Sequence, residues 1–323
     1  MRAIRIHEYG SADVLRTDDV PVPEPKAGEA LVKLEAVGLN FIDIYHRTGL
    51  YPLPLPSGLG GEGAGVVEEV GAGVTDLKPG DRVAYGNAPL GSYSEARLIP
   101  ADRLLKLPDG IDDKTAAAMM LKGLTAQYLI RQTYRVKAGD TILLHAAAGG
   151  VGLILSQWAK HLGATVIGTV GSDEKAKLAK AHGCAHTIIY TREDFVKRVD
   201  EITGGKKCPV VYDSVGKDTF MKSLDCLAPL GVLALFGQSS GAVEPFNLGL
   251  LAAKGSLYVT RPTLFTYAMK RENLVAMANE LFDVVKSGVV KIEVNQTYPL
   301  KDAAKAQADL AARKTTGSTV FLV

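Results

Sequence analysis

The sequence has few cysteines, no long apolar run and no large excess of charge of either sign. It contains three cysteines in 323 residues, Cys184, Cys208 and Cys226, and no two of them have Cys-x-x-Cys spacing. Three cysteines cannot build a disulfide framework, and their spacing excludes a cysteine-rich structural zinc site. We therefore expect reduced thiols and a cytoplasmic protein.

We predict neither a membrane nor a nucleic acid as a partner. No run of 18 apolar residues occurs that could span a bilayer. The opening MRAIRIHEYG carries charged residues and lacks the apolar segment of a signal peptide, so we expect no such leader. Because 37 Lys and Arg stand against 35 Asp and Glu, the formal charge of +2 is too small to attract nucleic acid or anionic lipid through the overall field.

Glycine and proline are plentiful, with 34 and 15 residues, and the length suits about two domains. Residues 1–123 predict a β-rich domain. Residues 30–37 alternate with a period of two, and residues 65–70 and 81–85 read as further short strands between Gly and Pro turns. Many short strands with this punctuation favour a small barrel or sandwich.

Residues 124–263 alternate apolar runs with helical patterns. Strands are predicted at 141–145, 165–170, 186–190, 210–215, 232–236 and 257–260, and helices at 153–162, 173–182, 193–202 and 219–227. Strands buried on both faces that alternate with helices predict an α/β domain with a doubly wound parallel sheet.

Residues 264–323 have a mixed pattern, with helices expected at 272–286 and 302–313 and strands near 291–294 and at 319–323. If this tail pairs with the first domain, residues 124–263 form an insertion whose two boundaries lie close in space.

The strongest chemical signal is the turn AAAGGVG at residues 146–152, between a predicted strand and a predicted helix. It is similar to the dinucleotide fingerprint G-x-G-x-x-G, with Ala147 in the first glycine position and Gly149 and Gly152 in the other two. The helix N-terminus offers unpaired N–H groups to phosphates. A strand–helix turn without a ligand is the alternative. We expect the diphosphate of a dinucleotide to contact Gly149, Gly150 and Val151.

The end of the second strand indicates which dinucleotide is bound. An NAD site usually has an acidic residue about 20 residues after the turn, where it binds the ribose 2′-hydroxyl. Gly171 and Ser172 stand there instead, and Lys175 follows closely. Asp173 and Glu174 come after the predicted strand end, where they suit a first helical turn. This pattern favours a 2′-phosphate and hence NADPH, unless Lys175 is only a solvated helix residue.

Several motifs together resemble the NADPH:quinone oxidoreductases of the zinc-free medium-chain dehydrogenase/reductase superfamily, which are similar to zeta-crystallin. The resemblance runs essentially from end to end. The motifs are NFIDIY at 40–45, GLYP at 49–52, GGEGAGVV at 60–67, the turn at 146–152, YDSVG at 212–216, FGQSSG at 236–241 and TRP at 260–262.

This resemblance implies a GroES-like β-barrel domain at 1–123 and 264–323, with an inserted Rossmann domain at 124–263 and the cofactor in the cleft between them. It implies that the 2′-phosphate is bound by Lys175, Tyr190 and Arg313. Other residues match positions near the nicotinamide or in loops after later strands: Asn40, Tyr45, Thr125, Val215, Phe236, Gly237 and Ser239. For each, an ordinary structural role is the alternative.

The same comparison predicts that no metal is bound. Zinc-dependent alcohol dehydrogenases of this superfamily have a Cys near the position of Asn40 and a His before the glutamate that matches Glu62, where this sequence has Gly61. Residues 86–91 leave no room for a four-cysteine lobe. An alcohol would lack the Lewis acid that stabilises its alkoxide, whereas a quinone is an easier acceptor.

We therefore expect NADPH to reduce a quinone, by hydride or stepwise electron transfer from nicotinamide C4, near Asn40, Tyr45 and Tyr51. Either Tyr45 or solvent can supply the protons. Two alternatives remain open: an NADPH-dependent enone or enoyl-thioester reductase, and a non-catalytic NADPH-binding protein. The resemblance also implies a homodimer through the apolar strand at 257–260, which would be a liability if left bare.

Overall fold

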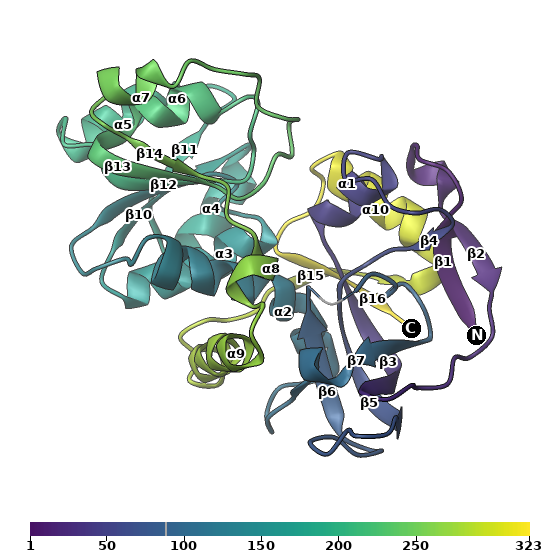
Figure 1. The fold of residues 1–323 in the computed structure, drawn as a ribbon. Coiled ribbons are helices and arrows are strands. Elements are labelled where there is room, and N and C mark those ends of the chain that lie inside the picture. Colours follow the sequence, from purple (N-terminus) through teal and green to yellow (C-terminus); the bar gives the residue numbers. More distant parts are fainter. Residues whose placement is uncertain (88) are drawn as a thin grey trace. The chain divides into compact units, whose positions relative to one another are not determined.

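The computed structural model describes residues 1–87 and 89–323, and the chain forms two compact units (Figure 1). Ala88, which belongs to the segment expected to lack a metal lobe, lies outside the described residues. The first unit combines both ends of the chain, and the second unit is inserted between them. The first consists of Met1–Leu124, Ala268–Lys286 and Ile292–Val323, and the second of Thr125–Tyr267 and Ser287–Lys291.

The longest strand of the first unit is β3 (Glu29–Leu39), which pairs antiparallel with β5 (Glu62–Val70), β7 (Ala96–Pro100) and β16 (Ser318–Leu322). Alternation along residues 30–37 predicts a half-buried strand, but β3 is buried on both faces over most of its length, and only Lys33 and Glu35 are exposed. In the register of β16 with β3, Thr319 lies opposite Leu39. The C-terminal tail therefore belongs to the same sheet as the N-terminal segment.

The remaining elements of the first unit extend this sheet or cover it. The strands β6 (Arg82–Gly86), β8 (Leu105–Lys106) and β15 (Val294–Pro299) belong to the sheet, and β2 (Arg16–Asp19), β1 (Arg2–Ile6) and β4 (Ser57–Gly58) form a second, smaller one. The helices are α1 (Phe41–Arg47), α9 (Arg271–Lys286), α10 (Ala303–Ala311) and the short turns η1 (Ala12–Val14), η2 (Ala101–Arg103) and η4 (Leu300–Asp302).

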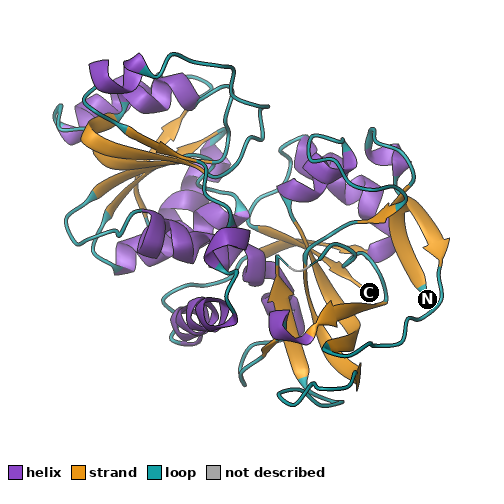
Figure 2. Cartoon of the chain, viewed as in Figure 1, coloured by secondary structure: helices purple, strands orange, loops and turns teal. Residues whose placement is uncertain are grey.

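Parallel strands build the second unit, in the spatial order β11-β10-β9-β12-β13-β14, with helices on both faces (Figure 2). The strands are β9 (Thr141–Leu144), β10 (Thr165–Val170), β11 (Cys184–Ile189), β12 (Cys208–Asp213), β13 (Leu227–Leu235) and β14 (Tyr258–Thr260). The helices are α3 (Gly150–His161), α4 (Asp173–Ala181), α5 (Phe195–Thr203), α6 (Phe220–Asp225), α7 (Gly249–Ala253) and α8 (Leu264–Tyr267). The predicted doubly wound parallel sheet is therefore confirmed.

A long helix, α2 (Asp113–Tyr128), escapes the sequence patterns, and a π-helical segment η3 (Leu129–Thr133) continues it. The middle of α2 is buried on all sides, and Ala116, Met119 and Leu124 are each 0% exposed. A helix without a polar face shows no 3.6-residue alternation in its sequence, which explains why this one was missed.

The strand expected near residues 291–294 lies later in the chain, because β15 runs from Val294 to Pro299. Both backbone groups of Lys291 are bonded to a side chain instead. The Lys291 N–H donates to Gln157 Oε1 at 2.9 Å, and Gln157 Nε2 donates to the Lys291 carbonyl at 3.0 Å. A residue held in this way has no backbone group left for a ladder.

Candidate active site

The candidate nucleotide site lies where β9 and β12 are neighbours in the parallel sheet, because the strand order reverses there. In open sheets of this kind, ligands bind outside the carboxyl ends of the strands at such a point. Gly149 is the N-cap of α3, and Gly150 and Val151 follow in its first turn. Amides of a first turn have no intrahelical acceptor, so they are available to phosphate oxygens.

Two glycines make this turn possible. A Cβ at Gly152 would lie 2.5 Å from the Ala146 carbonyl oxygen and 2.6 Å from that of Ala147. The helix can therefore start this close to the strand only with glycine there. Ala147 replaces the first glycine of the fingerprint. Gly168 on β10 leaves room for its methyl group, since a Cβ at Gly168 would lie 2.6 Å from the Ala147 Cβ.

The residues predicted to meet the 2′-phosphate lie largely together at the end of β10. Ser172 caps α4, and its hydroxyl accepts from the Lys175 N–H at 3.3 Å. The Tyr190 hydroxyl lies over Gly171, where an added Cβ would be 3.0 Å from it. Arg313 follows α10 and belongs to the first unit, so its part in this set stays a prediction.

Asp173, the acidic residue nearest to this strand end, has a partner that the sequence patterns did not reveal. Arg192 donates two hydrogen bonds to its carboxylate, from Nη1 at 2.8 Å and from Nη2 at 2.6 Å. The hydrogen bond from Arg192 lowers the pKa of Asp173, so the carboxylate is charged and neutralised by the guanidinium. This pairing leaves Asp173 poorly suited to accept from a ribose hydroxyl. No motif marks Arg192 in the sequence.

The structure also brings together the predicted residues in the loops after β12 and β13. The Ser239 N–H donates to the Ser214 carbonyl at 3.1 Å. At Gly237 an added Cβ would lie 2.6 Å from the same carbonyl oxygen. Val215 and Phe236 lie in these two loops, directly past the strand ends. Thr125 lies in α2 and is counted with the second unit.

In the first unit the structure places Asn40, Tyr45 and Tyr51 around α1. Asn40 is the N-cap of this helix and is 6% exposed. The Tyr45 ring contacts the Tyr51 ring edge-on, with centroids 5.2 Å apart, and the Phe41 ring lies 5.5 Å from Tyr45. Together with His46, whose ring is 6.0 Å from Tyr51, these side chains form an aromatic cluster.

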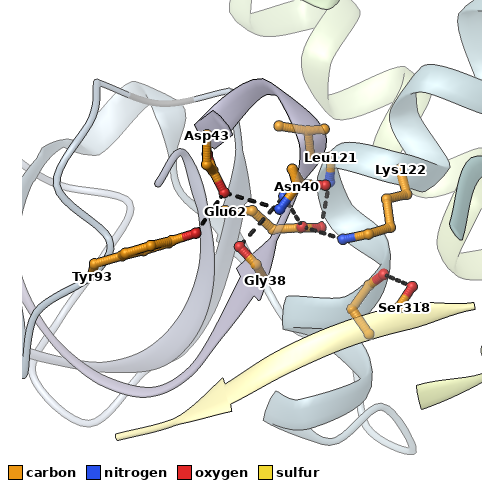
Figure 3. Close-up of polar contacts among 9 residues, drawn as sticks. Gly38, Asn40, Asp43, Glu62, Tyr93, Leu121, Lys122 and Ser318 are labelled. Carbon is orange, nitrogen blue, oxygen red and sulfur yellow. Dashed lines mark hydrogen bonds and ion pairs between the residues drawn. The ribbon is translucent and has the colours of Figure 1, made fainter. Parts of the chain in front are cut away.

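Behind Asn40 lies a fully buried carboxylate that sequence analysis used only as a landmark, Glu62 (Figure 3). Its Oε2 accepts from Asn40 Nδ2 at 2.7 Å and from the Lys122 ammonium at 2.8 Å, and its Oε1 accepts from the Leu121 N–H at 2.7 Å. Gly38 makes room for it, because a Cβ there would lie 2.1 Å from Oε2. The buried charge is thus both paired and hydrogen-bonded.

Asp43, a second buried carboxyl, lies one turn along α1 (Figure 3). Its Oδ2 accepts from the Asn40 N–H at 2.9 Å and from the Tyr93 hydroxyl at 2.8 Å. Its Oδ1 has no hydrogen-bond partner within the described part of the chain. Burial raises the pKa of Asp43 to about 7, although these hydrogen bonds and Lys122 act in the opposite direction.

Comparison with known proteins gives consistent matches along the chain. The family model "Alcohol dehydrogenase GroES-like domain" matches residues 26–109, and "Zinc-binding dehydrogenase" matches residues 150–280. A quinone oxidoreductase of Pseudomonas aeruginosa is 58% identical over 99% of both chains. The crystal structure of Escherichia coli quinone oxidoreductase complexed with NADPH has a TM-score of 0.99 at 51% identity and covers 100% of both chains.

The chain belongs to the quinone oxidoreductase family. The resemblance drawn from its motifs is thereby confirmed, as is the α/β fold of a GroES-like domain with an inserted Rossmann domain. A 2-haloacrylate reductase of a Burkholderia species is also similar, with 49% identity over 98% of this chain and 97% of that one. Quinone reductases and a reductase of activated C=C bonds thus share this architecture.

In this quinone oxidoreductase family member the residues do not fit a zinc ion, despite the name of one matching model. Asn40 and Gly61 stand where the resemblance places the zinc ligands of metal-dependent relatives, and both oxygens of Glu62 already accept hydrogen bonds. Among residues 1–87 and 89–323, no group of three or more His, Cys, Asp or Glu side chains could hold a metal. The Lys122 ammonium supplies the positive charge next to Glu62.

We predict that Asp43 makes the free energy of unfolding fall as pH rises. The folded state holds a proton on Asp43 up to about pH 7, whereas the unfolded chain releases it near 3.8. Between these values the folded state binds more protons, so stability decreases with pH and then levels off above about 7. Asp43→Asn should weaken this slope in urea titrations at pH 5, 6, 7 and 8.

The exposed Asp76 of the same unit provides the control for this measurement. Asp76→Asn should keep the slope of the unsubstituted protein. An identical pH dependence in Asp43→Asn and in the unsubstituted protein would refute a raised pKa at this position.

Proposed function

We propose that this chain reduces quinones with NADPH and needs no metal ion. The observation that carries the proposal is the near end-to-end identity with quinone oxidoreductases, one of which is described in complex with NADPH. The turn at Gly149 and the pairing of Asp173 with Arg192 at the end of β10 support the same cofactor.

The residues of the second unit suit the two charged parts of NADPH. The first-turn amides of α3 and its positive helix end would hold the diphosphate. Lys175 and Tyr190 would hold the 2′-phosphate, with Arg313 as a third contact. The pairing of Asp173 with Arg192 removes the repulsion that an uncompensated carboxylate would exert on that phosphate.

In the first unit, the aromatic cluster around Tyr45 and Tyr51 suits a flat quinone ring. Stacked or edge-on aromatic contacts contribute about 0.5–1.5 kcal/mol each beyond the area they bury. NADPH, when bound, supplies the hydride or electrons that reduce the quinone. Asn40 and Tyr45 would orient the acceptor, and either Tyr45 or solvent would deliver the protons.

A reductase of activated C=C bonds is the second candidate, because the Burkholderia relative at 49% identity is a 2-haloacrylate reductase. Such a substrate needs a proton at the carbon next to its electron-withdrawing group. A strong dependence on the Tyr45 hydroxyl would therefore favour this reaction over quinone reduction.

The activity test is a screen of NADPH oxidation by small quinones, enones and 2-haloacrylate, repeated with NADH. We expect turnover of quinones with NADPH, and Tyr45→Phe should keep most of it. Reduction of 2-haloacrylate without quinone turnover, abolished in Tyr45→Phe, would establish the second candidate. NADPH binding without oxidation by any acceptor would leave a non-catalytic binding protein.

Lys175→Ala should weaken NADPH binding by about 10- to 100-fold, because one charge-assisted contact contributes roughly 1.5–3 kcal/mol. NADH binding should change little, since NADH lacks the 2′-phosphate. Lys180→Ala, an exposed lysine at the other end of α4, is the matched control and should leave both affinities unchanged. Equal losses for NADPH and NADH in Lys175→Ala would contradict the assignment.

We also propose a cytoplasmic homodimer that pairs through the edge strand β14. Its three cysteines are free and buried, in keeping with a reducing compartment. Tyr258 on β14 is 60% exposed, and an apolar edge of this kind readily pairs with another strand. Light scattering should give twice the chain mass of 34.3 kDa, and Val259→Pro should lower it to one chain. A monomeric unsubstituted protein would refute the dimer.

No helix among the described residues is long and apolar enough to cross a membrane.

A further inference from the structure

A chain of buried polar side chains runs beneath the carboxyl ends of the second unit's strands, and the proposed function does not use it. His145 Nδ1 lies 2.9 Å from Thr169 Oγ1, and His145 Nε2 lies 3.0 Å from Ser223 Oγ. The Ser223 hydroxyl donates to Asp213 Oδ2 at 3.0 Å. All four side chains are at most 2% exposed.

The direction of these hydrogen bonds assigns the tautomer of a neutral His145 ring. Because Ser223 gives its single proton to Asp213, it must accept from Nε2–H, and Nδ1 then accepts from the Thr169 hydroxyl. Burial lowers the pKa of His145, which agrees with a neutral ring. The chain therefore ends on Asp213 as its acceptor.

Asp213 is the point where this chain meets the loop after β12. Besides Ser223, its carboxylate accepts from the Val215 N–H at 2.8 Å and the Gly216 N–H at 3.1 Å. The Thr219 hydroxyl lies 2.9 Å from Oδ1 and 2.7 Å from Oδ2. Residues 214–219 thus wrap around one buried carboxylate, with hydrogen-bond donors directed at it.

The loop after β13 is bonded in turn to the loop after β12. The Phe236 N–H donates to the Asp213 carbonyl at 2.8 Å, and the Ser240 N–H donates to the Val215 carbonyl at 2.9 Å. The Ser240 hydroxyl also accepts from the Asp218 N–H at 3.0 Å. Moving the first loop would therefore move the second.

We infer that Asp213 is a positioning residue that fixes both loops for the nicotinamide half of the cofactor. The inference rests on the proposed use of NADPH. Rossmann sheets consist of two mononucleotide-binding halves, and β12 and β13 belong to the half that does not hold the adenosine. The adenosine half, near Gly171 and Lys175, has its own hydrogen bonds at the ends of β10 and β11. Asp213 bonds directly to the loop after β12 and reaches β10 only through Ser223, His145 and Thr169, so its loss should affect the nicotinamide half first.

The test compares the whole cofactor with its adenosine half, adenosine 2′,5′-bisphosphate, by calorimetry on the full chain. Asp213→Asn places an amide N–H₂ group opposite the N–H and hydroxyl donors that now bond to the carboxylate, so these hydrogen bonds should be lost. The affinity for NADPH should then fall at least tenfold, while the affinity for the bisphosphate stays within twofold. Thr219→Val, which keeps the side-chain shape, should show the same selectivity and decides the question if Asp213→Asn does not fold. Asp200→Asn, an exposed acidic residue on α5, is the control and should change neither affinity.

A merely structural role for Asp213 predicts a different pattern, in which both ligands lose affinity together. Equal losses, or no loss for either ligand, would overturn the inference. If the unsubstituted chain binds the bisphosphate but not NADPH, the proposed cofactor is wrong, and this outcome is separate from any effect of the substitutions.

Discussion

The arrangement of the first unit depends on how the charge of Glu62 is compensated. A carboxylate that is 0% exposed, left without a partner, would destabilise the fold by several kcal/mol. Lys122 approaches it from α2, and Asn40 approaches it from the start of α1. Because Gly38 cannot hold even a methyl group there, the carboxylate has little freedom to move. The position of Asn40, and with it the first turn of α1, follows from this ion pair.

The second unit compensates its buried carboxylate differently. Around Asp213 the hydrogen-bond partners are backbone amides and side-chain hydroxyls, so the loop that supplies the amides is ordered by the charge it surrounds. In both units a buried acid lies behind residues proposed to contact ligand. The buried acids can therefore set the positions of these loops and of the start of α1 from inside the fold.

Whether a structural feature can be predicted from this sequence depends on how far apart in the chain the residues that form it lie. The β9–turn–α3 unit and the cap of α4 by Ser172 are local patterns, and the structure has both. The Glu62–Lys122 pair joins residues 60 positions apart, and the Asp173–Arg192 pair joins residues 19 apart. Such partners have no fixed spacing in a chain, so a single sequence does not reveal them. Helix α2 was missed because burial on all sides removes its periodicity.

The most direct test of the account is a double-mutant cycle on the buried ion pair, read as the free energy of unfolding in urea. Glu62→Gln should cost about 3–5 kcal/mol, because it leaves the Lys122 ammonium buried without a counter-charge. Adding Lys122→Met should recover most of that loss, giving a coupling of a few kcal/mol. A nearly neutral Glu62→Gln, or effects of the two substitutions that simply add, would contradict the central role of this pair.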